Sequence, residues 1–310
     1  MSSRFFVYTP RGGSQTSQEP GAKPWRECIS GCERLGPTAT ELPDRFQPDD
    51  ILIVWSPFRG SKRWKAYQAA KAAGSRVIVM ERGWLSPIKG APYFQLALDG
   101  WNGTGRFEPG GAERWRSWGI PQHDWRREGK HILVIGDDRR NNARDPRRTP
   151  IGWAESVRFD SPRPVARRLT RNQWVPLQMQ FENAWCTVVW TSSVAIKSIL
   201  SGIPVFYCGP NLVGAELARL GLDIEHPVMP EREPVLERIA WMQWSRAELA
   251  SGEPFARLLA LPHSGEPQLV EELPPIPSMW TPAGRLRALG TKLPPWIGLN
   301  GLVGRALGIT

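Results

Sequence analysis

The sequence predicts an α/β protein of two units, each built on a sheet of mainly parallel β-strands. Short runs rich in β-branched and aromatic residues alternate with segments of helical periodicity, a pattern typical of β-α-β units. The 310 residues suffice for two domains of ordinary size. A composition of 41% hydrophobic and 23% charged residues is typical of a globular chain.

The first unit is predicted from three strand-like runs with helical segments between them. Pro24 suits a first helical position, and Gly74 suits the residue that follows a helix. The predicted elements are strands Phe5–Tyr8, Ile51–Trp55 and Arg76–Met80 and helices Pro24–Leu35, Ser61–Ala73 and Glu113–Trp118. The segment Leu85–Gly111 is rich in glycine and proline and is expected to be a loop.

A polar stretch, Pro121–Lys130, is expected to link the first unit to the second. The predicted elements of the second unit are strands His131–Ile135, Val188–Trp190 and Val205–Tyr207 and helices Ser192–Leu200, Ala215–Leu220 and Pro234–Leu249. We therefore expect domains at residues 1–128 and 129–272. Residues 273–310 contain four basic and no acidic side chains and are expected to form a Pro/Gly-rich tail that packs back on the body.

Missing patterns disfavour several classes of protein. No apolar run approaches the roughly 18 residues of a membrane-spanning helix, and the N-terminus lacks the features of a signal peptide, so a cytoplasmic protein is expected. The four cysteines show no metal-ligand spacing, so no metal is expected. The sequence contains no GxxxxGK[ST], no GxGxxG after a predicted strand, no GxSxG and no HExxH.

Basic residues are concentrated in one part of the chain. The formal net charge is +10, and ten arginines face only three acidic residues between positions 139 and 171. These arginines are Arg139, Arg140, Arg144, Arg147, Arg148, Arg158, Arg163, Arg167, Arg168 and Arg171. Guanidinium groups bind phosphate through paired hydrogen bonds. The stretch therefore suits contact with phosphate or nucleic acid, although a solvated loop explains it equally well.

The sharpest motif joins the strand that ends near Trp190 to the helix that follows. Thr191, Ser192 and Ser193 stand at the predicted N-terminus of this helix, where small hydroxyl residues act as caps. Backbone N–H groups and the positive end of the helix dipole favour an anion there. Such a ligand would lie at the carboxyl end of a strand, where open α/β sheets bind ligands. A plain β-α-β unit with a capped helix and no ligand fits the pattern as well.

The string VVWTSSVAIKSILSGIPVFYCG resembles the donor-site segment of GT-B glycosyltransferases, notably capsule-polysaccharide and lipopolysaccharide sugar transferases. The resemblance implies two Rossmann-like domains that face a cleft, with the nucleotide-sugar bound by the C-terminal domain and no metal required. It carries over to Thr191, Ser192, Ser193 and Lys197 as donor-binding residues, with Gly202 and Pro204 shaping the next turn.

The resemblance extends loosely to two other segments of the second unit. In VRFDSPRP such enzymes often have an R-x-H-P-like motif; this chain has no histidine there, which leaves Arg158 and Arg163 as candidates for the donor. In LVIGDDRRNN, Gly136 and Asp137 follow the first strand of the donor domain and are expected to approach the donor.

The resemblance implies a catalytic base from the first unit, and an inverting glycosyl transfer typically uses a carboxylate or a histidine to activate the acceptor hydroxyl. The candidates are Asp99, in the glycine-rich LALDGWNGTG, and Glu81, at the end of a predicted strand. Asp99 is preferred narrowly over Glu81. Each also has a structural explanation, as a turn residue or as an ion-pair partner.

The charge distribution suggests an anionic acceptor. The foremost expectation is DNA with hydroxymethylated bases, as for small bacteriophage DNA glucosyltransferases, with a donor such as UDP-glucose and a base flipped out of the duplex. The expected nucleic-acid contacts are Arg139, Arg140, Arg144, Arg147, Arg148, Arg167 and Arg168. The alternatives are transfer to a surface polysaccharide or lipid-linked glycan, and a non-catalytic nucleic-acid-binding α/β protein.

Overall fold

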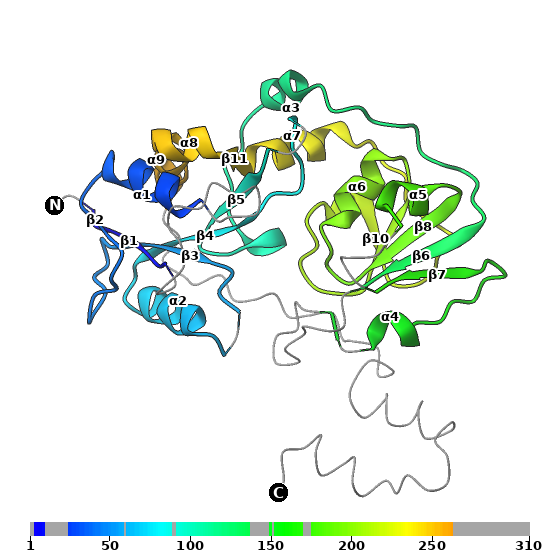
Figure 1. Ribbon diagram of the computed structural model, residues 1–310, viewed down its shortest axis with the longest axis horizontal. Coiled ribbons are helices and arrows are strands. Elements are labelled where there is room, and N and C mark those ends of the chain that lie inside the picture. Colours follow the sequence, from blue (N-terminus) through cyan, green and yellow to red (C-terminus); the bar gives the residue numbers. More distant parts are fainter. Residues whose placement is uncertain are drawn as a thin grey trace, which may run out of the picture.

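The computed structural model describes residues 3–9, 24–58, 60–88, 91–136, 149–150, 152–169 and 175–262. They form two α/β units that lie side by side, each with its own β-sheet (Figure 1). One sheet has six strands and the other has five. The predicted fold class, two Rossmann-like α/β units, is confirmed.

The first sheet has the strand order β11-β5-β4-β3-β1-β2. Its strands are β1 (Phe5–Val7), β2 (Thr38–Ala39), β3 (Ile51–Trp55), β4 (Arg76–Arg82), β5 (Tyr93–Leu98) and β11 (Gln243–Ser245). The strands from β2 to β4 are parallel, whereas β5 and β11 run antiparallel to their neighbours β4 and β5. Helix α2 (Lys62–Ala72) covers one face and α1 (Trp25–Glu33) the other (Figure 1).

The central strand β3 shows why this sheet forms. All five of its side chains are buried, as expected for a parallel strand covered on both faces. Ile51, Ile53 and Trp55 belong to the hydrophobic cluster on the α1 side, and Leu52 and Val54 to the cluster on the α2 side. The continuous apolar run of the sequence therefore fills two cores at once.

The second sheet is entirely parallel, in the order β10-β9-β8-β6-β7. Its strands are β6 (His131–Ile135), β7 (Val165–Arg168), β8 (Ala184–Val189), β9 (Val205–Tyr207) and β10 (Ala218–Leu220). The helices of this unit are α4 (Trp153–Ser156), α5 (Leu177–Phe181), α6 (Val194–Leu200) and the 3-10 turn η2 (Ala215–Leu217). Separate hydrophobic clusters pack on its two faces.

Two expected elements are wrong. The expected loop Leu85–Gly111 contains strand β5, which pairs with β4, and the 3-10 turn η1 (Asn102–Thr104). The expected helix Pro234–Leu249 is divided into α7 (Glu233–Trp241), strand β11 and α8 (Arg246–Ser251). The break occurs because Ser245 caps α8 with a capping box and the residues before it pair with β5.

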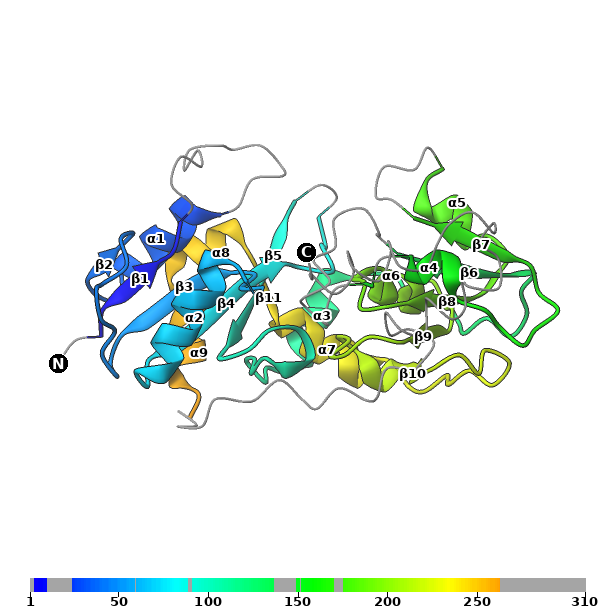
Figure 2. The ribbon, with the colours of Figure 1, turned by 90° about the horizontal axis from the view of Figure 1, so that it is seen from below.

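After the second sheet the chain returns to the first unit. Strand β11 joins the first sheet, and α8 and α9 (Glu253–Ala260) lie with α1 on one of its faces (Figure 1). Helix α7 packs against α3 (Ala112–Trp118) between the two units (Figure 2). Domain limits drawn from the sequence, 1–128 and 129–272, do not anticipate this return.

Smaller differences concern the second unit. Strand β7 and helices α4 and α5 are additions to its predicted elements, as α9 is to those of the first unit, and the expected helix Ala215–Leu220 is η2 followed by β10. The expected link Pro121–Lys130 has no regular secondary structure. Within the described ranges, no helix combines the length and the apolarity needed to cross a bilayer.

Candidate functional site

The donor-like segment lies at the carboxyl edge of the second sheet. Strand β8 ends at Val189, and the chain passes through Trp190 and Thr191 before α6 begins at Val194. Ser192 is bound at both of its oxygens: its carbonyl accepts from the N–H of Ala195 at 3.0 Å, and its Oγ accepts from the N–H of Val194 at 3.3 Å. The predicted order of strand, hydroxyl residues and helix is confirmed, but α6 has only seven residues.

Packing and strand pairing fix the backbone at this edge of the sheet. Trp190 is buried and packs edge-on against Trp153 of α4, with ring centroids 5.7 Å apart. Strand pairing continues past β9, because the N–H of Gly209 donates to the carbonyl of Trp190 at 3.0 Å. A Cβ on Gly209 would lie 2.5 Å from the Trp190 ring and 2.7 Å from Thr191 Cγ2. The backbone on either side of Thr191 is thus fixed by close packing.

Two residues expected near the donor lie at the opposite edge of the sheet. Gly202 and Pro204 precede β9, so they stand at its amino end, whereas Ser193 follows the carboxyl end of β8. Gly202 has φ +70°, and a Cβ there would lie 1.9 Å from the carbonyl oxygen of Asp124. Gly202 lets the linking segment pass close by, so these two residues shape the turn before β9 at the edge opposite Ser193.

Other residues of the expected donor set differ in their surroundings. A Cβ on Gly136 would lie 2.6 Å from Cβ of Ala154, so this glycine allows α4 to pack against the end of β6. Ser193 and Lys197 are exposed, and Thr191 is half-buried. Asp137 lies outside the described residues.

The described arginines of the basic stretch bond within the protein. Arg158 donates to the carbonyls of Glu155 and Val157, and Arg167 to those of Ala154 and Val157. Arg168 donates to the carbonyl of Val175 at 2.9 Å and to Oε1 of Gln180 at 2.7 Å. The remaining members, Arg139, Arg140, Arg144, Arg147, Arg148 and Arg171, lie outside the described residues.

Arg163 is bound even more fully. Its Nη1 pairs with the Glu225 carboxylate, and its guanidinium lies 4.7 Å from the ring centroid of Trp185. The hydrogen bond from Ser161, followed by those from Arg163, holds the pKa of Glu225 below its ordinary value. These contacts fix Arg163 at the amino side of the sheet, since it precedes β7, and they do not fit the expected contact with a donor.

Asp99 is buried in an ion-paired centre. Its carboxylate lies 2.9 Å from Nζ of Lys71 and 3.4 Å from Nη2 of Arg106, and Oδ1 accepts from the N–H of Val77 at 3.1 Å. Only 1% of the residue is exposed. Because β5 is antiparallel, Asp99 stands at the amino end of β4. The expected turn is present, with φ 62°, but this geometry does not fit a base that must reach an acceptor hydroxyl.

Glu81 lies at the carboxyl edge of the first sheet, one residue before the end of β4. It is half-buried and accepts a hydrogen bond from Oγ of Ser56, which follows the carboxyl end of β3. Ser56 is 4% exposed and has a left-handed backbone, φ 40°. A strained, buried serine that orients a strand-end carboxylate is typical of a functional site.

A row of polar side chains extends from Glu81 across two more strands. Glu81 pairs with Gln95 of β5, and Gln95 pairs with Gln243 of β11, so the three side chains share one face of the sheet. Gln95 and Gln243 are fully buried. Gln243 Oε1 accepts from the N–H groups of Trp84 and Leu85, at 2.7 and 3.1 Å, which fixes the chain after β4.

Sequence reasoning missed Ser56, Gln95 and Gln243. The available signal is a polar residue inside or directly after an apolar run, as in ILIVWS and YFQLAL. Gln243 could not be found this way, because the periodicity around it predicts a helix.

The first unit reaches the edge that carries Thr191 through η1. The N–H of Gly103 donates to the carbonyl of Asn211 at 3.2 Å, and Asn211 lies just after the carboxyl end of β9. A Cβ on Gly103 would lie 3.2 Å from the backbone of Asn211. The two units therefore touch at the carboxyl side of the second sheet.

The comparisons give similarity to solved structures only. No protein-family model and no curated protein matches the chain. Two solved structures of KpsC from Thermosulfurimonas dismutans are similar to the structure of this chain. The beta Kdo 2,7 transferase has a TM-score of 0.45 and 12% identity over 82% of this chain and 99% of its own. The beta Kdo 2,4 transferase has a TM-score of 0.46 and 13% identity over 77% and 90%. Similarities this distant do not specify an activity.

Proposed function

We propose that the chain is a glycosyltransferase that moves a sugar from a nucleotide-sugar donor to a hydroxyl group of a surface glycan, polysaccharide or lipid-linked. The observation that carries the proposal is the carboxyl edge of the all-parallel second sheet, where β8 turns into α6 through Thr191, Ser192 and Ser193. Ligands of open α/β sheets bind at this edge. The resemblance of the same segment to donor sites of GT-B enzymes supports a sugar diphosphate as the ligand.

The residue roles follow from position. Thr191 and Ser193 offer hydroxyl groups to the donor phosphates, and Ser192 braces the start of α6. Glu81 is the proposed base, since its carboxylate stands at the carboxyl edge of the first sheet and is oriented by Ser56. A positioned base contributes about 10²- to 10⁴-fold to such a transfer.

A glycan acceptor is preferred to DNA on one structural ground. Arg167 and Arg168, two of the expected nucleic-acid contacts, direct their guanidinium groups to acceptors within the protein. To bind DNA, these two side chains would have to exchange those hydrogen bonds for contacts with DNA phosphates. The exchange would remove much of the favourable free energy of binding the phosphate backbone.

The first test is donor binding by the full chain, measured as thermal stabilisation by UDP-, GDP- and CMP-sugars. A donor at a hundredfold excess over its Kd stabilises a protein by about 2.7 kcal/mol. Ser193→Ala should weaken that donor by about tenfold or more, because a hydrogen bond to a charged group is lost. Ser117→Ala, an exposed serine on α3, is the matched control. Stabilisation by none of the donors would overturn the proposal.

The second test is transfer itself. Glu81→Gln should lower the rate by about 10²-fold or more while donor stabilisation is unchanged, and the exposed Glu128→Gln is the control. Acceptors are compared as glycan and as hydroxymethylcytosine DNA. Sugar transfer to the DNA alone would contradict the glycan acceptor, and DNA binding without any donor effect would indicate a non-catalytic nucleic-acid-binding protein.

A further inference from the structure

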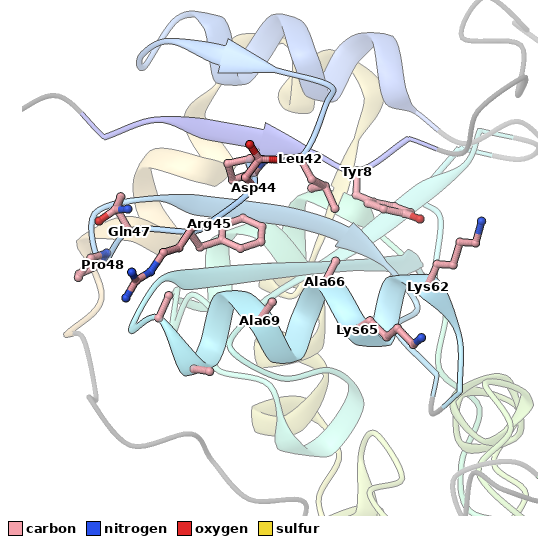
Figure 3. Close-up of a pocket in the computed structure, with 14 residues that line it drawn as sticks. Tyr8, Leu42, Asp44, Arg45, Gln47, Pro48, Lys62, Lys65, Ala66 and Ala69 are labelled. Carbon is pink, nitrogen blue, oxygen red and sulfur yellow. The ribbon is translucent and has the colours of Figure 1, made fainter.

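A groove of about 740 Å³ runs along helix α2 on the outer face of the first unit (Figure 3). One wall is the helix face that carries Ala66, Ala69 and Ala73, and the other is the segment 42–48. The volume lies within the range of sites that bind small molecules, roughly 300–1,000 Å³.

The groove exists because of side-chain sizes. Phe46 is buried and packs edge-on against Phe6 of β1 at 5.8 Å, which fixes the segment 42–48 against the sheet. The facing positions of α2 are alanines, whose methyl groups do not fill the space. Asp50 holds the end of the segment, because its carboxylate accepts from the N–H of Gln47 at 2.7 Å and pairs with Arg4.

Exposed cations line both ends. Lys62 and Lys65 stand at one end beside Tyr8, and Arg45 stands at the other (Figure 3). Asp44 is the acidic side chain of the lining. Across the parts of the chain that the structure describes, no ion pair is formed by these three cations, whereas Lys71 of the same helix pairs with Asp99. The groove therefore offers positive charge that the fold itself does not use.

One end of the groove opens at the carboxyl edge of the first sheet. Tyr8 follows the last residue of β1, and Lys62 begins α2, which follows β3. Strand β4, which carries Glu81, is the next neighbour of β3 in the sheet. A chain lying in the groove would thus lead toward the edge on which Glu81 and Ser56 stand.

We propose that this groove binds an acidic segment of the acceptor glycan, with its carboxylate or phosphate groups at Lys62, Lys65 and Arg45. The inference rests on the proposed function, because it makes the groove the path of the acceptor. A short single chain of sugars matches the volume, the apolar alanine wall and the cations at the ends. A DNA duplex is too large to enter a groove of this size.

The test is calorimetric binding of an oligomer of galacturonic acid to the full chain, with a neutral glucose oligomer of equal length and a short DNA duplex as the other ligands. Lys62→Glu combined with Lys65→Glu should weaken binding of the acidic oligomer by about tenfold or more. The matched control reverses two exposed charges of the linking segment, Arg127→Glu with Lys130→Glu, and should stay within about twofold.

A second variant separates shape from charge. Ala69 is exposed, so Ala69→Trp fills the groove without disturbing the core, and it should weaken the acidic oligomer while the net charge is unchanged. The inference is overturned if wild-type protein does not bind the acidic oligomer, if it binds the neutral one equally, or if the variants lose DNA and not oligomer. Thermal stabilisation by the nucleotide-sugar donors is measured on the same samples. Its absence refutes the proposed function, whereas the proposal that the groove binds an acidic glycan is judged by oligomer binding alone.

Discussion

Arg114 of α3 is predicted to be a strongly stabilising contact between α3 and the elements with which the chain returns to the first unit. Its guanidinium donates to the carbonyls of Ala240 and Gln243, both at 2.9 Å, and binds both oxygens of Glu248 at 2.6 and 3.1 Å. The same group lies 4.5 Å from the ring centroid of Trp244. One residue thus joins α3 to the end of α7, to β11 and to α8.

The magnitude follows from these contacts. Only 11% of the Arg114 side chain is exposed, and 29% of that of Glu248, so this pair is screened far less than a surface ion pair. Arg114→Met keeps the apolar stem but leaves Glu248 and two carbonyls without their donor. Removing one partner of a buried pair costs 3–5 kcal/mol, and the partial exposure of Glu248 places the expected loss at about 3 kcal/mol. Arg114→Lys keeps the charge and should lose about 2 kcal/mol with the two carbonyl bonds.

The assay is urea unfolding, which gives the free energy of unfolding of each variant as a function of pH. Burial raises the pKa of Glu248, but the hydrogen bonds from Arg114 and Ser245 together lower it by more. The pKa of Glu248 is therefore below its ordinary value. A depressed carboxyl pKa gives stability that is present above the ordinary value of 4.5 and is lost as the pH falls through the folded-state pKa. The difference between wild type and Arg114→Met should therefore shrink below about pH 4.5. Arg116→Lys, 71% exposed, is the control, and a similar loss in both variants would refute the reasoning.

The remaining predictions concern other buried contacts. Asp99→Asn should lower the free energy of unfolding by about 3 kcal/mol, because two cations lose their partner, while the transfer rate of the folded protein stays within about twofold; a large loss of rate at normal stability would restore Asp99 as the base. Gly202→Ala should cost about 2 kcal/mol or more, whereas Gly119→Ala, also at positive φ but with nothing within 4 Å, should cost about 1 kcal/mol; equal losses in thermal unfolding would contradict the close approach. Desolvation of the half-buried Cys208 raises the pKa of its thiol to about 12, so its alkylation at pH 8 should be on the order of a thousandfold slower in native than in unfolded protein, and comparable rates would refute the raised pKa.

Most of the local elements could be predicted from the sequence because their signals are local. The apolar run Ile51–Trp55, the capped helix over residues 61–73 and the strand–hydroxyl–helix order around Ser192 depend on neighbours within a few residues, and the structure contains all three. Glu81 was found as a strand-end carboxylate for the same reason.

The tertiary structure alone decided the features that depend on distant partners. Strand β5 was hidden in a glycine-rich segment and β11 in a helical pattern, because pairing partners decide both: β5 pairs with β4, and β11 pairs with β5 across more than a hundred residues of chain. The antiparallel pairing of β5 with β4 moved Asp99 to the amino edge of the sheet, beside Lys71 and Arg106. The pairings of β5 with β4 and with β11 together placed Gln95 and Gln243 in line with Glu81.

The sequence by itself thus determined the α/β class and the residue types available for chemistry, since these follow from composition and short-range periodicity. Strand order and packing decided which of these residues share an edge of a sheet. They also decided which arginines donate hydrogen bonds to backbone carbonyls. Arg167 shows the reason: its charge is visible in the sequence, but the carbonyls of Ala154 and Val157 that bind it are brought there only by the fold.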